Sequence, residues 1–195
     1  MPYADAVDDL VRAAGEADVA VSLEQPHGEV LSFAETVFGP AIAAEIAKLG
    51  YPKPAELPWI VEELYLYGLE ELSDRQAGYR TDARTGEASA GWDKDRFVIA
   101  DWTANPISVG ADGAICYSRH GEGAWTYVLI AKDLPTFLSM LAAWLRYFVV
   151  TRSANLFDEN FEIADETRDE IRREVLGAVE KTDQDAALGF LLGEL

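Results

Sequence analysis

Two histidines, one cysteine and many carboxylates are the residues of this chain that could support chemistry. Neither His27 nor His120 has a second histidine at metal-ligand spacing, and His120 has no nearby nucleophile. His120 lies in Ser118–Gly123, between two predicted strands, and is interpreted as a solvated residue at a hairpin tip. Cys116 follows an isoleucine in an apolar run and is predicted to be buried; a single cysteine excludes an internal disulfide and a multi-cysteine zinc site.

The carboxylate runs do not match a known site. Asp158–Asp169 is as acidic as a calcium loop, but its sixth residue is Ile163 rather than glycine and its twelfth is Asp169 rather than glutamate. Pairs such as Glu62/Glu63 are common in an acidic chain, and sequence alone does not give their separation. Gly121-Glu122-Gly123 lacks the rest of a dinucleotide fingerprint. We therefore predict no catalytic residue, no metal and no cofactor, with a carboxylate-dependent hydrolase as a minor alternative.

Aromatic residues around the predicted strands are more informative. Most of them, including Trp102 and Trp125, are expected in the core or on strand faces. Trp92 is the expected exception, because it lies among carboxylates in Gly91–Asp95 at the edge of a long polar loop. An exposed aromatic in that setting could anchor a basic partner.

The net charge is extreme. The chain has 16 Lys plus Arg and 35 Asp plus Glu, which gives a net charge of −19. Such a field repels nucleic acid and attracts basic proteins. The alternative is that the charge only keeps the protein soluble.

The sequence also favours a cytoplasmic protein without a membrane partner. The first residues after Met1 are polar and do not resemble a secretory signal. The apolar stretch Leu138–Val150 is interrupted by Arg146 and is short for a transmembrane span, so a buried helix is predicted there.

Periodicity predicts helices first, then strands, then helices. Helical spacing covers Ala4–Ala17, a run from Val30 that Gly39-Pro40 interrupts, a further helix that ends at Gly50, and Leu57–Tyr67. Tyr51–Pro54 is predicted to be a rigid connector, because two prolines cannot continue a helix. Gly68–Leu72 is predicted to start a strand, and Ser73–Gly91 is predicted to be a long loop. Four short runs rich in β-formers follow, with a tight turn at Asp112-Gly113. The expected strands are Phe97–Ala100, Pro106–Val109, Ala114–Tyr117 and Trp125–Ile130.

The short connections between these strands require antiparallel neighbours. Asp133 is expected to cap the next helix, and an acidic helix over Asp165–Lys181 is expected to place Ile171, Val175 and Val179 on one side. Asp183 is expected to cap the last helix. The fold class is therefore α+β, a twisted antiparallel sheet with flanking helices. The domains are 1–150, with the N-terminal helices, and 151–195, an acidic helical extension.

The order of the motifs resembles the SUKH superfamily. The resemblance runs from Leu57-Pro58 through Phe97–Asp101, Asn105–Ile107 and Gly113–Ile115 to Ile130–Leu138, and covers about Leu57–Leu145. Tyr67-Gly68-Leu69 comes earlier than the family pattern has it, and Ser73–Gly91 reads as an insertion. The matching residues Asp101, Asn105, Pro106, Gly113, Trp125 and Phe137 imply structural roles.

This resemblance implies an immunity-type protein that binds and neutralises a cognate toxin, often a nuclease, of a bacterial polymorphic toxin system. Such a partner is expected to be basic. The alternative is a non-catalytic adaptor in cell regulation. The predicted partner-binding residues lie on the long loop and a hairpin tip: Asp82, Glu87, Trp92, Asp93, Asp95 and Glu122.

Overall fold

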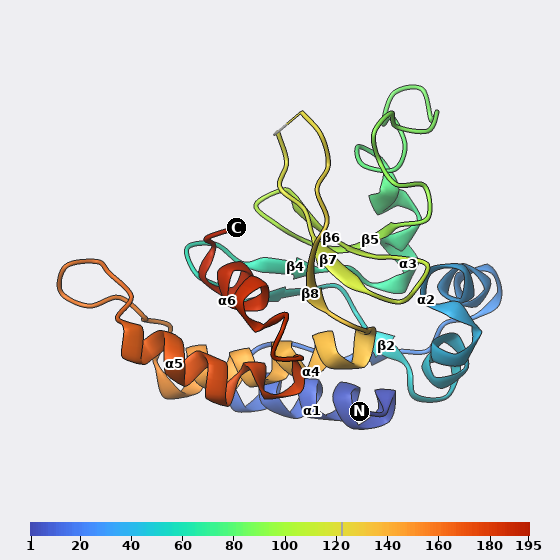
Figure 1. The fold of residues 1–195 in the computed structure, drawn as a ribbon. Helices are drawn as coiled ribbons and strands as arrows, with labels where there is room; N and C mark the ends of the chain where they lie inside the picture. Colours follow the sequence, from blue (N-terminus) through green and yellow to red (C-terminus); the bar gives the residue numbers. More distant parts are fainter. Residues whose placement is uncertain (122) are drawn as a thin grey trace.

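The computed structural model describes residues 1–121 and 123–195, and its centre is an antiparallel sheet (Figure 1). The strands lie in the order β3-β4-β5-β6-β7-β8, so each pairs with its neighbour along the chain. β1 and β2 form a separate two-stranded ribbon. The predicted α+β class is confirmed. The strands are β1 (Leu23–Glu24), β2 (Tyr51–Pro52), β3 (Ala55–Leu57), β4 (Leu64–Leu66), β5 (Phe97–Trp102), β6 (Asn105–Val109), β7 (Ile115–Tyr117) and β8 (Val128–Ala131).

Helices pack against the sheet and against one another. In Figure 1, α1 and α4 lie side by side below the sheet, and α6 lies over β8. α4 continues directly into a π-helical stretch, Leu145–Thr151. The helices are α1 (Tyr3–Glu16), α2 (Gly28–Leu49), α3 (Leu69–Leu72), α4 (Leu134–Trp144), α5 (Asp165–Glu174) and α6 (Gln184–Leu192).

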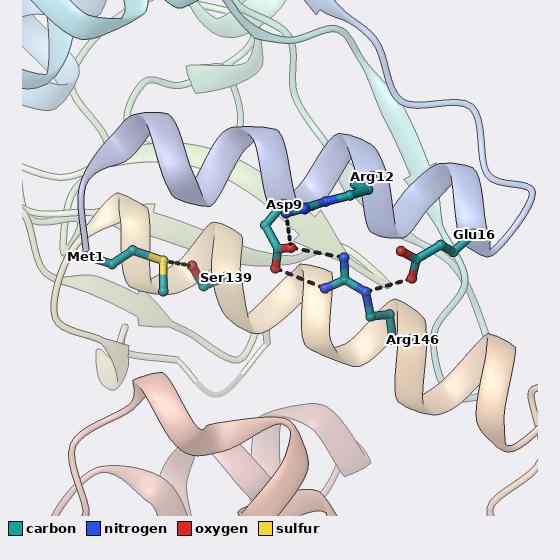
Figure 2. A network of polar contacts seen from close by, with 6 residues as sticks. All are labelled: Met1, Asp9, Arg12, Glu16, Ser139 and Arg146. Atoms are coloured by element: carbon teal, nitrogen blue, oxygen red, sulfur yellow. Dashed lines mark hydrogen bonds and ion pairs between the residues drawn. The ribbon is translucent and has the colours of Figure 1, made fainter.

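α4 is the central helix of the core, as its apolar sequence predicts. Asp133 caps it by accepting a hydrogen bond from the Thr136 N–H at 2.8 Å, which confirms the predicted cap. The Trp144 indole donates to the Pro58 carbonyl at 3.1 Å and stacks on Phe148. Arg146 follows in the π-helical stretch, and its guanidinium reaches carboxylates on α1 (Figure 2).

The predicted helix over Leu57–Tyr67 is wrong. The chain forms a hairpin of β3 and β4, with Leu57 opposite Leu64 and Ala55 opposite Leu66. Alternate residues of a strand share a face, so these apolar side chains are buried together. Ile60, in the β3–β4 connection, is buried as well. The apolar residues therefore fall at intervals that resemble those of a helix.

Three further predictions also differ from the structure. Gly68–Leu72 forms the short helix α3, whose first turn carries two acidic residues that suit a helix N-terminus. Tyr51–Pro54 is not only a connector, because its first two residues pair as β2 with β1. The acidic helix ends at Glu174 and is followed by a 3-10 turn, Leu176–Ala178. The Gln184 side chain donates to the carbonyls of Leu176 and Val179, which satisfies acceptors left free where the helix ends.

Two local signals are confirmed and one is not. Asp112-Gly113 joins β6 to β7, with Gly113 at φ 82°, where glycine has no steric penalty. Gly39 kinks α2 at φ 78° just before Pro40. Asp183 precedes α6, but its side chain does not cap the helix and accepts a hydrogen bond from Thr182 instead.

The C-terminal residues belong to the same hydrophobic core as the sheet. Ile171 and Val175 on the acidic helix are buried, as predicted. Phe190 of α6 packs 5.2 Å from Trp59 and 5.5 Å from Tyr117, measured between ring centroids. α6 therefore closes the core over β8.

Two helices have the length and composition of membrane spans, namely Gly28–Leu49 and Leu134–Thr151. The most apolar window of the second is 72% buried in the protein, against 22% for the first. Core helices satisfy the same criterion. The cytoplasmic location and the lack of a membrane partner stay predictions.

Candidate partner-binding surfaces

A cluster of aromatic rings joins the long loop, residues 73–96, to the connection between β7 and β8. In Figure 1 both segments rise from the same side of the sheet. Trp92 from the loop lies 5.0 Å from Trp125 and 5.6 Å from Tyr127, measured between ring centroids. Tyr79 completes this aromatic cluster at 6.0 Å from Trp125. Edge-to-face pairs of this kind stabilise beyond the area they bury, so the loop is held in place.

The prediction that Trp92 is exposed is wrong. Its side chain is only 7% exposed, and its indole N–H donates to the Arg96 carbonyl at 3.0 Å. The next residue, Asp93, donates its backbone N–H to the Tyr127 hydroxyl at 2.8 Å. Trp92 therefore anchors the loop from inside and presents no ring to a partner.

Cys116 lies on β7 and is buried, as predicted. Burial raises the pKa of the Cys116 thiol more than the neighbouring Arg96 lowers it. The thiol is therefore protonated at neutral pH and is a poor nucleophile. The Arg96 guanidinium stacks over the Tyr127 ring at 4.6 Å and stands 3.6 Å from the Asp93 carboxylate.

Asp82 and Glu87, two predicted binding residues, are exposed at the two ends of one turn. The Asp82 N–H donates to the Glu87 carbonyl at 2.8 Å and closes the turn. The Asp82 carboxylate accepts the N–H groups of Arg84 and Thr85 at 2.9 and 2.8 Å. These backbone hydrogen bonds lower the pKa of Asp82, so its charge also stabilises its own turn.

Asp93 and Asp95 share a second turn, in which the Asp95 N–H donates to the Asp93 carboxylate at 3.0 Å. Both residues are exposed. Glu122, the remaining predicted binding residue, lies outside the residues that the structure describes.

The long loop is not an acidic surface. Residues 73–96 contain five Asp or Glu and five Lys or Arg, so their net charge is zero. The surplus of carboxylates lies in residues 1–72, with 14 acidic and three basic residues, and in residues 158–194, with 12 acidic and four basic residues. Any field that attracts a cation therefore originates mainly from these two segments.

A tyrosine and arginine patch lies on the sheet beside the loop and was not found from the sequence. Tyr65 and Tyr67 stand 5.6 Å apart, and the Arg75 guanidinium lies 4.8 and 5.0 Å from their ring centroids. Arg75 also pairs with Glu71 at 2.8 Å. The Tyr67 hydroxyl donates to Asp101 at 2.6 Å, and burial together with this carboxylate raises the pKa of Tyr67. The i, i+2 spacing of the two tyrosines was the available signal, but the predicted helix obscured it.

Within residues 1–121 and 123–195, no group of three or more His, Cys, Asp or Glu side chains is placed to hold a metal ion. His120 packs its ring 5.8 Å from Trp125 and lines a hollow of about 210 Å³. Its backbone N–H donates to the Asn105 side chain at 2.9 Å.

No family model, curated protein or solved structure matches this chain. The resemblance to the SUKH superfamily therefore stays a prediction.

Proposed function

We propose that this protein is an immunity-type protein, which binds a cognate basic toxin of a bacterial polymorphic toxin system and neutralises it in the cytoplasm. One observation carries the proposal: the surplus carboxylates are confined to residues 1–72 and 158–194, while the long loop is neutral. A surplus of this size attracts a cationic partner and can raise the rate at which the two proteins meet.

Physical chemistry supports a nuclease as one class of partner. A nuclease grips phosphate with lysine and arginine, and a fixed array of carboxylates can occupy the same groups. Steering by such an array raises association rates by roughly 10–10³-fold at low salt. Inhibition of this kind requires binding alone and no catalytic residue.

The N-terminal acidic segment offers one such array. Asp5 and Asp8 project from α1 and are exposed. Together with Val11, Arg12 and Leu23 they line an open hollow of about 670 Å³ between α1 and β1. The hollow gives a partner both carboxylates and apolar surface within one area.

Two members of the tyrosine and arginine patch reach the surface, Tyr65 and Arg75, whereas Tyr67 is only 1% exposed. These two residues favour a second candidate function, an adaptor that binds another protein without neutralising it. Tyrosine and arginine are the residue types that most often dominate binding energy at protein interfaces. Such a partner need not be basic, because Arg75 is already paired with Glu71.

Co-expression with the product of the neighbouring gene tests the proposal. An immunity-type protein is expected to restore growth to cells that produce the toxin and to co-purify with it. The double variant Asp5→Asn/Asp8→Asn is expected to weaken the complex at low salt more than Asp82→Asn/Glu87→Gln, because the latter pair lies on the neutral loop. Failure of the two proteins to associate at low salt, together with a lack of protection, contradicts the proposal.

A further inference from the structure

Two hollows meet at Phe157, on the side of the molecule where the chain leaves the π-helical stretch. The first has a volume of about 310 Å³ and lies between the β3–β4 connection and the stretch 154–157. The second, of about 430 Å³, lies between Phe161 and the C-terminal residues. Phe157 lines both, so we treat them as one groove, named the Phe157 groove.

The groove carries three of the five exposed large apolar side chains in the described parts of the chain, including the two most exposed. Val61 is 85% exposed, Phe161 is 84% exposed and Phe157 is 39% exposed. The other large apolar side chains that are exposed are Met1 and Val150. A concentration of apolar surface at one groove is typical of a binding site, whereas single exposed apolar residues are ordinary.

Val61 is held outward by a turn that is anchored on both sides. The Glu62 N–H donates to the Ile60 carbonyl at 2.9 Å, so Val61 is the central residue of a three-residue turn. Ile60 is 3% exposed, and the Trp102 indole donates to the Glu62 carbonyl at 3.2 Å. Val61 has φ 72°, a conformation that a β-branched residue rarely adopts. The turn therefore presents an apolar side chain to solvent at a cost in backbone strain.

Phe161 is presented in a similar way. Its N–H donates to the Asp158 carbonyl at 3.1 Å, and it adopts φ 61°. The Asp158 carboxylate accepts the N–H groups of Asn160 and Glu162 at 2.8 and 3.0 Å. This turn directs the phenylalanine away from the core while its neighbours are fixed.

Carboxylates surround the apolar surface. Glu62, Glu63, Glu162 and Asp165 line the groove. Neither residues 54–74 nor residues 153–167 contain a lysine or an arginine. The cation in the groove wall, Arg168, is bound by both carboxylate oxygens of Glu194 at 2.8 and 2.6 Å. The rim is therefore negative and its floor apolar.

We propose that the Phe157 groove binds a basic segment of another protein by taking up one large apolar side chain, whose flanking lysines or arginines pair with the carboxylate rim. This inference rests on the proposed function, because it names the kind of segment that the basic partner supplies. A second copy of this chain is a poor occupant, since its net charge is also −19 and it repels the rim.

The test uses a synthetic peptide with one phenylalanine flanked on each side by two lysines, and a matched peptide with glycine in place of the phenylalanine. Binding to the full chain is measured by calorimetry and by NMR shift changes. The phenylalanine peptide is expected to bind about tenfold more tightly and to shift resonances of Val61, Phe157 and Phe161. Equal affinity for the two peptides, or shifts elsewhere on the molecule, overturns the proposal.

Two variants test the groove without disturbing the fold. Val61→Gly and Phe161→Gly remove exposed side chains at positive φ, where glycine is tolerated without strain. Each is expected to weaken binding of the phenylalanine peptide about tenfold. Val150→Ala, which removes exposed apolar surface from a residue that does not line the groove, is the control and is expected to bind as the parent protein does.

The outcomes separate this inference from the proposed function. If Val61→Gly and Phe161→Gly leave peptide binding and toxin protection unchanged, the groove proposal fails while the immunity role stands. If the parent protein binds the peptide selectively but no neighbouring toxin associates with it, the immunity role fails and the groove stands.

Discussion

Arg146 donates hydrogen bonds from two guanidinium nitrogens to the two carboxylate oxygens of Asp9, at 3.0 and 2.9 Å, and so joins α4's continuation to α1 (Figure 2). Glu16 accepts a third hydrogen bond from the same guanidinium at 2.7 Å. The guanidinium lowers the pKa of Asp9 below its ordinary value of 3.8. This contact connects two helical segments whose residues are 137 positions apart in the sequence.

The Asp9–Arg146 contact predicts a pH-dependent stability. Because the folded pKa of Asp9 lies below its unfolded pKa, its contribution is complete above the unfolded value and is lost as pH falls through the folded value. Asp9→Asn is expected to cost about 1–2 kcal/mol near pH 7. Denaturant unfolding of both proteins should show this difference shrinking below about pH 4. A difference that stays constant down to pH 2 contradicts the assigned contact.

Trp92 is predicted to be essential for stability. Trp92→Ala removes a buried ring from the aromatic cluster and is expected to cost about 3–5 kcal/mol in the free energy of unfolding. Val150→Ala, at an exposed site, should change it by less than about 0.5 kcal/mol. If Trp92→Ala were as mild as the control, the ring would be exposed as the sequence first indicated.

Gln76 is predicted to act as a substitute strand partner for β5. Its amide donates to the Val98 carbonyl at 2.9 Å and accepts the Val98 N–H at 2.9 Å. Gln76→Leu leaves both buried backbone groups unpaired and should cost about 2–4 kcal/mol. Gln25→Leu, at an exposed glutamine, serves as the control in the same urea titration. Equal midpoints for the two variants would rule out this role.

Val61 is predicted to lower the stability of the protein. Val61→Gly removes the strain of a β-branched residue at positive φ and takes away no buried apolar surface. It should therefore raise the free energy of unfolding by roughly 0.5–1 kcal/mol, despite the greater flexibility of the unfolded chain. Val150→Gly, in the π-helical stretch, should instead destabilise by roughly 0.5 kcal/mol. Thermal unfolding of the two variants should therefore shift in opposite directions, and a common direction argues against strain at Val61.

Local chemistry made part of the fold predictable. The Asp112-Gly113 turn and the Asp133 cap each depend on one or two residues and their own backbone, so the sequence signal was sufficient. The β3–β4 hairpin depends on pairing with β5, as in Leu66 opposite Ala100, which is far along the chain. Helical spacing and strand alternation were both present there, and only the distant partner decided between them.

The candidate site was less predictable for the same reason. Trp92 is surrounded by charges in sequence, yet its ring packs on Trp125 from another segment. The equal numbers of acidic and basic residues in the long loop were countable from the sequence and would have argued against an acidic face there. The exposure of Val61 and Phe161 depends on backbone conformation and required the structure.

The association rate between this protein and the toxin it protects against, measured at about 20 and about 300 mM salt, tests the central claim most directly. If surplus carboxylates draw in a basic partner, the rate constant should fall by at least about tenfold at the higher salt while dissociation changes little. A rate that does not depend on salt would contradict the claim that charge brings the two proteins together.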